Sequence, residues 1–315
     1  MANIQTQIKS IIKVTRPIQW AKNFSVFAAL IFSGNLYNKP LFINVFWVFW
    51  VFCFAASSTY IFNDLFDASK DKLHPIKRSR PIASGALPIS IAIVECIFLA
   101  LIALSIASSI SSLVFLVTAF YLVLQVAYSS FLKKLAIIDI IIIATGFVIR
   151  VYAGAFAINA HLSVWFLLCV ISTALFLAAG KRRSELSLVG KDGKTRQALS
   201  HYPRELLNSY VTMFASAAWM SWALFTFFES PPVPKNLWLF LADFSKTTTI
   251  SKLLMITIPF AIFAIMRYQG LIFEGRSEAP EKVLLTDISL ITSIALWIIL
   301  VVWILYGGFQ FTFNS

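Results

Sequence analysis

Three aspartates at helical spacing are the residues of this sequence best placed to do chemistry. Asp64, Asp67 and Asp71 follow a long apolar segment at positions i, i+3 and i+7, and Asn63 precedes them. On a helix that continues the apolar segment, these positions share a face, so the carboxylates and the amide are expected to point to the same place. Hard oxygen ligands in this number suit Mg²⁺, which bridges carboxylates to a diphosphate. We predict a Mg²⁺ site with Asn63, Asp64, Asp67 and Asp71 as ligands.

A basic segment follows the acids directly. Pro75 is expected to end the helix, and Lys77, Arg78 and Arg80 come next as donors for phosphate oxygens. The alternative is an acidic helix end beside a basic loop, both simply solvated. The full arrangement of acids and bases at the end of an apolar segment favours the site.

A second polar cluster begins at Lys181 and includes Arg182, Arg183 and Glu185. Lys181 and Glu185 are one helical turn apart, so both are expected to face the first motif. The alternative is a basic anchor at a membrane surface with an incidental ion pair. Composition alone does not separate these two interpretations.

The elements that must carry these residues are transmembrane helices. The chain has 315 residues, of which 59% are hydrophobic and only 13% charged, about half the charge of a soluble domain. Apolar runs long enough to cross a bilayer recur along nearly the whole chain. We predict about nine spans in one polytopic membrane domain, residues 1–315, at 23–37, 41–62, 88–109, 111–131, 136–158, 162–180, 207–228, 252–273 and 287–307.

The charged residues between these spans alternate in number from one connection to the next. Of the 26 Lys and Arg residues, 21 fall in one set of connections and four in the other, with Arg150 inside a span. The positive-inside bias then places the N-terminus and the motif loops, about 63–88 and 181–206, in the cytoplasm. An odd number of spans leaves the C-terminus outside the cell membrane, with an outer loop at about 229–251.

The formal charge of +12 does not indicate a nucleic-acid partner, because the basic residues lie between spans. Anionic substrates at one membrane face explain the excess better. The cysteines, Cys53, Cys96 and Cys169, are far apart within apolar runs, so neither a disulfide framework nor a zinc site is expected.

Ionisable residues inside the predicted spans need polar surroundings. Asp139 and Arg150 lie in one span and should face a cavity or a partner. Arg150 is expected either to reach a phosphate or to bond to neighbouring helices. Tyr128 is a polar side chain for which the same two alternatives stand.

The segment Asn63–Asp71, of the form NDxxDxxxD, resembles the first aspartate-rich motif of the UbiA superfamily of intramembrane prenyltransferases. That resemblance implies a helical ring around a cavity that opens to the cytoplasm and laterally to lipid. A second aspartate-rich motif is general in the superfamily, whereas this chain has only Glu185, with Asp192 two turns later.

That departure points to one branch of the superfamily. Three further segments resemble the decaprenyl-phosphate phosphoribosyltransferase branch. The segments are RPIQWAKN from Arg16 to Asn23, KRRSELSLVG with TRQALSHY between Lys181 and Tyr202, and EAPEKVLLTD from Glu278 to Asp287. The resemblance implies catalytic roles for Asp64, Asp67, Asp71, Lys181 and Glu185. It implies substrate binding by Lys22, Asn63, Lys77, Arg78, Arg80, Tyr128, Arg150, Arg182, Arg196 and Tyr202.

The reaction that this branch implies is the Mg²⁺-dependent transfer of 5-phosphoribose from phosphoribosyl pyrophosphate to a polyprenyl phosphate. A lipid phosphate is already ionised at neutral pH, so the attack needs no general base. The main rival is a conventional UbiA enzyme that moves a prenyl group from a prenyl diphosphate to an aromatic acceptor. A transporter is disfavoured because the polar cluster is one-sided and inverted repeats are not evident. A homo-oligomer is left open.

Overall fold

A computed structural model of the chain describes residues 4–74, 77–192, 202–229, 250–274, 283 and 286–307. Within these ranges the chain is helical or in turns and contains no strand, which confirms the predicted all-α class. The elements are α1 Ile4–Val14, η1 Pro17–Phe27, α2 Ala28–Phe32, α3 Lys39–Asp71, η2 Lys77–Ser79, α4 Ile89–Ile110, α5 Ser112–Ser130, η3 Leu132–Lys134, α6 Ile138–Ala157, α7 Val164–Asp192, α8 Arg204–Phe228, η5 Ile250–Thr257, α10 Ile258–Phe273 and α12 Ile288–Tyr306, where η marks a 3₁₀ helix.

Among the described residues, eight helical segments are long and apolar enough to cross a membrane. They agree within a few residues with eight of the nine predicted spans, although α3 extends well beyond the predicted end at 62. The multi-pass prediction is therefore confirmed. The predicted outer loop, 229–251, falls almost wholly outside the described residues.

The predicted first span, 23–37, takes a different form. Here the chain runs as the eleven-residue 3₁₀ helix η1 and continues directly into the five-residue α2. A 3₁₀ helix rises about 2.0 Å per residue against about 1.5 Å for an α-helix. At that rise the eleven residues of η1 cover about 22 Å, against about 17 Å for the same number in an α-helix. Among the described residues this segment is not one of the eight membrane-length helices, so its role as a ninth span stays a prediction.

The described chain divides into two compact units, while the prediction of a single membrane domain stays a prediction. The first unit holds α1, η1 and the helices from α3 to α6. The second holds residues 30–37, α7, α8, η5, α10 and α12.

Helix α3 is the central element of the first unit and packs against η1, α4, α5 and α6. It begins where the Asn38 side chain accepts a hydrogen bond from the Leu41 amide, with Pro40 in the first turn, as helix starts favour. Its 33 residues span about 50 Å, which exceeds a ~30 Å hydrocarbon core. The last turns of α3, which carry the acidic motif, therefore project beyond the apolar layer.

Small side chains let α4 approach α3 closely. The Ser58 hydroxyl donates to the Cys96 carbonyl at 2.8 Å, and the Cys96 thiol donates to the Ser58 carbonyl at 3.3 Å. Small residues and reciprocal bonds of this kind are typical of helix contacts in membranes. All three cysteines are free, Cys53 buried and Cys96 and Cys169 half-buried.

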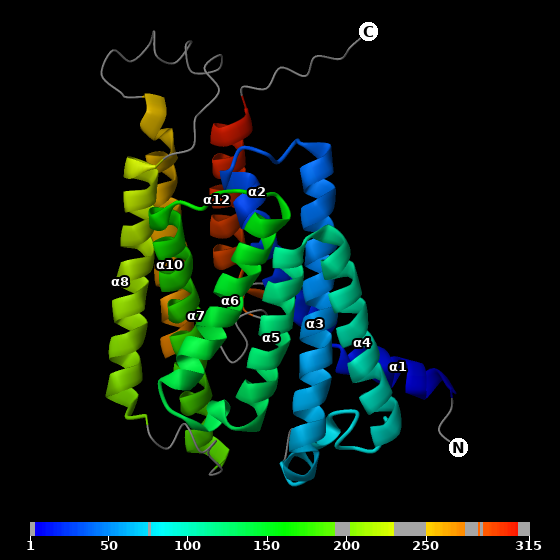
Figure 1. Ribbon diagram of the computed structural model, residues 1–315. Coiled ribbons are helices and arrows are strands. Elements are labelled where there is room, and N and C mark those ends of the chain that lie inside the picture. The colour runs from blue at the N-terminus through cyan, green and yellow to red at the C-terminus, as the bar shows by residue number, and fades with distance from the viewer. Residues whose placement is uncertain are drawn as a thin grey trace. The chain divides into compact units, whose positions relative to one another are not determined.

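Helix α1 runs across α3 and α4 rather than along them (Figure 1). Val14 at its end packs with Ile61 of α3, Ala92 of α4, and Ile82 and Leu87 of the connection between α3 and α4. This apolar cluster fixes the segment after α1 and the loop after the acidic motif against the same end of α3.

In the second unit, a core cluster joins α7, α8, α10 and α12 through Phe176, Val211, Ile272 and Leu290. Asp287 caps α12 by accepting from the Leu290 amide at 2.9 Å. The same carboxylate receives two hydrogen bonds from Arg267 of α10, at 3.1 and 2.6 Å. The start of α12 is therefore tied to α10 by a two-point ion pair.

Candidate active site

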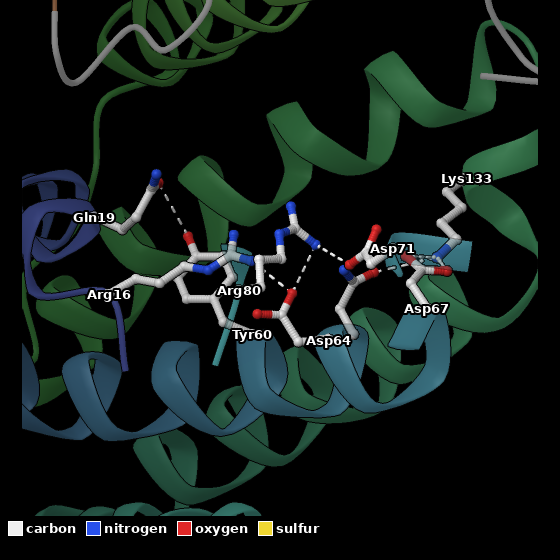
Figure 2. A network of polar contacts seen from close by, with 9 residues as sticks. Arg16, Gln19, Tyr60, Asp64, Asp67, Asp71, Arg80 and Lys133 are labelled. Atoms are coloured by element: carbon white, nitrogen blue, oxygen red, sulfur yellow. Dashed lines mark hydrogen bonds and ion pairs between the residues drawn. The ribbon is translucent and has the colours of Figure 1, made fainter. Parts of the chain in front are cut away.

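The acidic motif occupies the last two turns of α3, as the spacing predicted. Asp64 and Asp71 are buried, at 3% and 4% exposure, and Asp67 is half-buried. Buried carboxylates need compensating charge. Three cations supply it, each from a different segment of the first unit, and Figure 2 shows them converging on the acids.

Two arginines meet Asp64. Arg16, between α1 and η1, places Nη2 at 2.6 Å from Asp64 Oδ1, and Arg80, just after η2, places Nη1 at 2.9 Å from the same oxygen. The Arg80 Nη1 atom also lies 2.6 Å from Asp71 Oδ2. One arginine nitrogen therefore joins two carboxylates that are seven residues apart.

Lys133 from η3 is the counter-ion of the remaining acid, Asp67. Its Nζ donates to Asp67 Oδ1 and Oδ2 at 2.8 and 2.7 Å, and to Asn63 Oδ1 at 3.2 Å. The ammonium also lies over the Phe66 ring at 5.3 Å, a favourable cation–π position. The lysine is only 7% exposed, so it acts as a fixed counter-ion rather than a solvated surface charge.

The backbone of Arg16 is strained, with φ of 53° and ψ of 63° ahead of Pro17. A non-glycine residue rarely takes this left-handed conformation, and a following proline disfavours helical backbone further. Neighbouring bonds hold it in place: Ser57 of α3 donates to the Thr15 carbonyl at 3.0 Å and accepts from Trp20 at 3.1 Å. Strain held by surrounding structure is typical of functional sites. Here it directs the Arg16 guanidinium to Asp64.

The donor set fits a hard divalent cation. Lys133 Nζ is surrounded by three oxygens from Asp67 and Asn63, and Arg80 Nη1 lies between oxygens of Asp64 and Asp71. Each of these nitrogens therefore marks a position where protein oxygens already surround a positive charge. Carboxylate and amide oxygens are the protein ligands that Mg²⁺ prefers, one or two at a time beside phosphate oxygens.

We predicted that all three carboxylates and the amide would point to a single place, and the geometry is more divided. In the described ranges, no group of three or more His, Cys, Asp or Glu side chains is placed to hold one metal ion. The physical reason is the helix itself: at 3.6 residues per turn, Asp64 and Asp71 lie nearly in line along α3, whereas Asp67 is rotated about 60° to one side of Asp64. The acids form two sets, Asp64 with Asp71 around Arg80, and Asp67 with Asn63 around Lys133.

Of the three predicted phosphate donors after the helix, Arg80 contacts Asp64 and Asp71 in this structure. Lys77 and Arg78 lie on η2, where both are exposed. Pro75 falls outside the described residues. Exposed donors beside the acid cluster are in the right place to meet an incoming anion, so their substrate role stays a prediction.

Lys22 lies on η1, as does Gln19. Its ammonium donates to Gln19 Oε1, which also accepts from the Tyr60 hydroxyl at 3.4 Å. Tyr60 in turn lies beneath the Arg16 guanidinium at 5.1 Å. A row of polar contacts thus runs from Arg16 through Tyr60 and Gln19 to Lys22. The phosphate role of Lys22 stays a prediction.

Arg150 lies in a buried cluster of the first unit. It donates through Nε to Asn23 Oδ1 at 2.7 Å, through Nη2 to the Tyr121 hydroxyl at 3.0 Å, and through Nη1 to the Gly146 carbonyl. The side chain is 5% exposed. These contacts favour the structural alternative that the sequence left open for Arg150. Tyr128 lies near the end of α5 and is half-buried, so its role stays undecided between the two alternatives.

The second polar cluster lies at the end of the membrane-spanning part of α7. Arg182 is fully buried and places Nη1 2.6 Å from Glu185 Oε2, while Arg183 donates to Asn208 of α8. Lys181 is half-buried and Tyr202 is buried. Arg196 lies outside the described residues. The predicted roles of these residues stay predictions.

Sequence reasoning missed two members of the acid cluster. Arg16 stood within a noted motif but was not assigned to the site, and Lys133 was counted only as a topology signal. A proline directly after Arg16 hinted at a special backbone. For Lys133 the sequence offers no local signal, because its partners lie 66 and 70 residues away.

Comparison with known proteins identifies the family to which the chain belongs. Residues 23–269 match the UbiA prenyltransferase family. Decaprenyl-phosphate phosphoribosyltransferase of Corynebacterium glutamicum is 37% identical over 302 residues, which cover 94% of this chain and 86% of that protein. The protein of the same name from Mycobacterium tuberculosis is 33% identical over 285 residues, 89% of either chain.

The fold also has a solved counterpart. The structure of a UbiA homolog from Archaeoglobus fulgidus bound to GPP and Mg²⁺ has a TM-score of 0.66 to this chain, at 17% identity. The similarity covers 93% of this chain and 99% of the archaeal one. With the family match over most of its length, this chain belongs to the UbiA prenyltransferase family.

Proposed function

We propose that this protein transfers 5-phosphoribose from phosphoribosyl pyrophosphate to a polyprenyl phosphate and releases pyrophosphate. The observation that carries the proposal is the acid cluster with its three counter-ions at the end of α3. Similarity of 33–37% to decaprenyl-phosphate phosphoribosyltransferases over nearly the full chain supports the choice of donor and acceptor.

The reaction needs one bond to form and one to break. An oxygen of the ionised lipid phosphate attacks C1 of the ribose, and the bond between C1 and the pyrophosphate oxygen breaks with its electron pair on the leaving group. No proton has to move in this step. The demand on the protein is to bind and stabilise negative charge on the departing pyrophosphate.

The acid cluster provides for this demand. Asn63, Asp64, Asp67 and Asp71 are the residues that would hold Mg²⁺, which when bound neutralises charge on the leaving group. Arg16, Arg80 and Lys133 balance the three carboxylates without a metal. When a metal joins the site, that positive charge is in excess, and an anionic diphosphate restores the balance. The cluster therefore favours a metal and a diphosphate bound together.

The topology belongs to the proposal as well. We place the N-terminus and the acid cluster in the cytoplasm, where a soluble phosphorylated donor is supplied, and the C-terminus outside the cell membrane. Single cysteines introduced on a cysteine-free background, at Lys72 and in the outer loop, test this with a membrane-impermeant thiol reagent on intact cells. Labelling of the outer loop alone supports the assigned orientation, and labelling at position 72 alone reverses it.

The activity is tested with purified protein in detergent, Mg²⁺, radiolabelled phosphoribosyl pyrophosphate and a polyprenyl phosphate. We expect label in the lipid phase, lost on adding EDTA and reduced about 10²-fold or more in Asp67→Asn. This change keeps the side-chain shape and an oxygen that can accept from Lys133. Glu205→Gln, an exposed acid on α8, is the matched control and should retain activity.

The rival reaction is tested in the same preparation. If no label transfers while a prenyl diphosphate and an aromatic acceptor give product, the protein is a conventional prenyltransferase. If neither pair of substrates reacts in a folded preparation, the proposed transferase activity is refuted.

A further inference from the structure

Arg80 holds an unusual position among the cations of the acid cluster. A single atom, Nη1, bonds both Asp64 Oδ1 at 2.9 Å and Asp71 Oδ2 at 2.6 Å. These two oxygens therefore lie no more than 5.5 Å apart, with the arginine nitrogen between them. A metal ion bound to both carboxylates would need the same space, so metal and Arg80 cannot occupy it together.

The other two cations make different contacts. Arg16 bonds Asp64 from a strained backbone that is anchored to Ser57. Lys133 is nearly buried and bonds the two oxygens of one carboxylate, Asp67. Within the described network, Arg80 is the cation that connects two carboxylates through one atom, and hence the one whose place a bridging metal must take.

Arg80 has somewhere to go. Its side chain is 25% exposed, and it follows directly after η2, which carries the exposed donors Lys77 and Arg78. Its backbone is fixed, since the Arg80 amide donates to the Lys77 carbonyl at 3.0 Å and its carbonyl accepts from Ser84 at 2.8 Å. A displacement is therefore confined to the side chain, which would swing toward solvent and the other phosphate donors.

We propose that Arg80 is an exchangeable counter-ion: it binds Asp64 and Asp71 in the metal-free protein, leaves them when a divalent cation binds, and then donates to the diphosphate. This inference rests on the proposed function and adds to it a coupling between the binding of the metal and the binding of the diphosphate. Arg80 opposes binding of the metal alone and supports binding of the metal with its diphosphate. One residue thus makes the two ligands bind cooperatively, which is a coupling free energy between them.

The exchange predicts that one variant changes the affinities for metal and for pyrophosphate in opposite directions. Arg80→Gln removes the competitor, so Mn²⁺ should bind more tightly in the absence of diphosphate, by about 10-fold, within the usual range of coupling between ligands. The same variant removes a donor, so pyrophosphate should bind more weakly at saturating Mn²⁺, by about 10-fold for one charge-assisted bond. A residue that merely supports the fold, or one that binds only substrate, would not tighten the metal.

The measurement is Mn²⁺ binding to purified protein in detergent by electron paramagnetic resonance, then pyrophosphate titration at saturating Mn²⁺. The matched control is Lys72→Gln, which removes one exposed positive charge beside Asp71 without removing a contact to the acids. It measures the effect of net charge alone, and Arg80→Gln must exceed it. Arg80→Lys is the second variant if Arg80→Gln does not fold. Lysine keeps the positive charge but lacks the Nη1 atom that reaches both acids. It should tighten Mn²⁺ less than Arg80→Gln but beyond wild type.

Each result is decisive. Tighter Mn²⁺ with weaker pyrophosphate in Arg80→Gln, and little change in Lys72→Gln, supports the exchange. If the wild type binds Mn²⁺ and the Arg80 variants bind it equally or more weakly, the exchange is wrong while the metal site stands. If neither wild type nor variants bind Mn²⁺, with or without pyrophosphate, the metal site of the proposed function is itself refuted and the exchange with it.

Discussion

Gly154 of α6 offers a test of how η1 is held in the first unit. A Cβ atom added at this position would lie 1.9 Å from the Val26 carbonyl oxygen and 2.9 Å from its carbon. Real Cβ atoms essentially never come closer than 3.0 Å to a neighbour. Because the obstacle is backbone rather than a flexible side chain, Gly154→Ala must push η1 and α6 apart by about 1 Å.

The consequence follows from what η1 positions. Val26 lies near the end of η1 and Arg16 just before its start, so a shift of about 1 Å that η1 makes as a rigid body would stretch the 2.6 Å contact from Arg16 to Asp64 beyond hydrogen-bond range. Overpacking costs about 1–3 kcal/mol, partly offset by the roughly 1 kcal/mol that alanine gains over glycine in a helix. A misplacement of this size can lower a reaction rate about 10²-fold. We therefore expect a modest loss of stability and a large loss of transfer activity.

Gly146 provides the matched control on the same helix. A Cβ atom there would meet Arg150 and Gln125 at 3.5 Å, an ordinary contact. Gly146→Ala should keep activity and unfold at an equal or higher temperature. The assays are phosphoribosyl transfer to lipid and thermal unfolding in detergent. If Gly154→Ala matches Gly146→Ala in both, the idea that close backbone packing positions η1 and Arg16 is refuted.

Three further changes test other contacts. Arg150→Met should lower the unfolding temperature, because the buried Asn23 oxygen loses its donor at about 1–3 kcal/mol; a large rise in KM for the donor at unchanged unfolding temperature would instead make Arg150 a substrate ligand. Asp287→Ala should destabilise by about 1 kcal/mol through its lost cap, and Asp287→Asn by less because the amide oxygen can still cap; equal unfolding temperatures for the two would contradict this. Lys133→Met should unfold at a lower temperature in EDTA and regain part of the loss in Mg²⁺, since the metal can replace the ammonium beside Asp67; no recovery in Mg²⁺ would argue against a metal at that acid.

Much of this protein was readable from local patterns. The apolar runs predicted the apolar parts of eight transmembrane helices within a few residues, because a span needs a length of apolar sequence that few other structures need. The helical spacing of Asp64, Asp67 and Asp71 placed the three acids in the last two turns of α3, but not their division into two sets. Both features depend on residues that are neighbours in sequence.

The counter-ions of the acids could not be read in this way. Arg16 and Lys133 meet their aspartates across 48 and 66 residues, and which basic loop residue reaches which acid depends on how α1, η1 and η3 pack around α3. Among more than twenty basic residues, the sequence gives no means of choosing these two.

The tertiary structure also favours one of two alternatives that the sequence had left equal. Arg150 could serve a phosphate or the fold until its burial and its bonds to Asn23 and Tyr121 favoured the fold. The predicted first span begins as a 3₁₀ helix, and α6 approaches it backbone to backbone at Gly154. Sequence periodicity determines the helices and the face that carries the carboxylates, since both arise from contacts within a few residues. The partners of each charge arise from contacts between distant segments, and only the packed structure determines them.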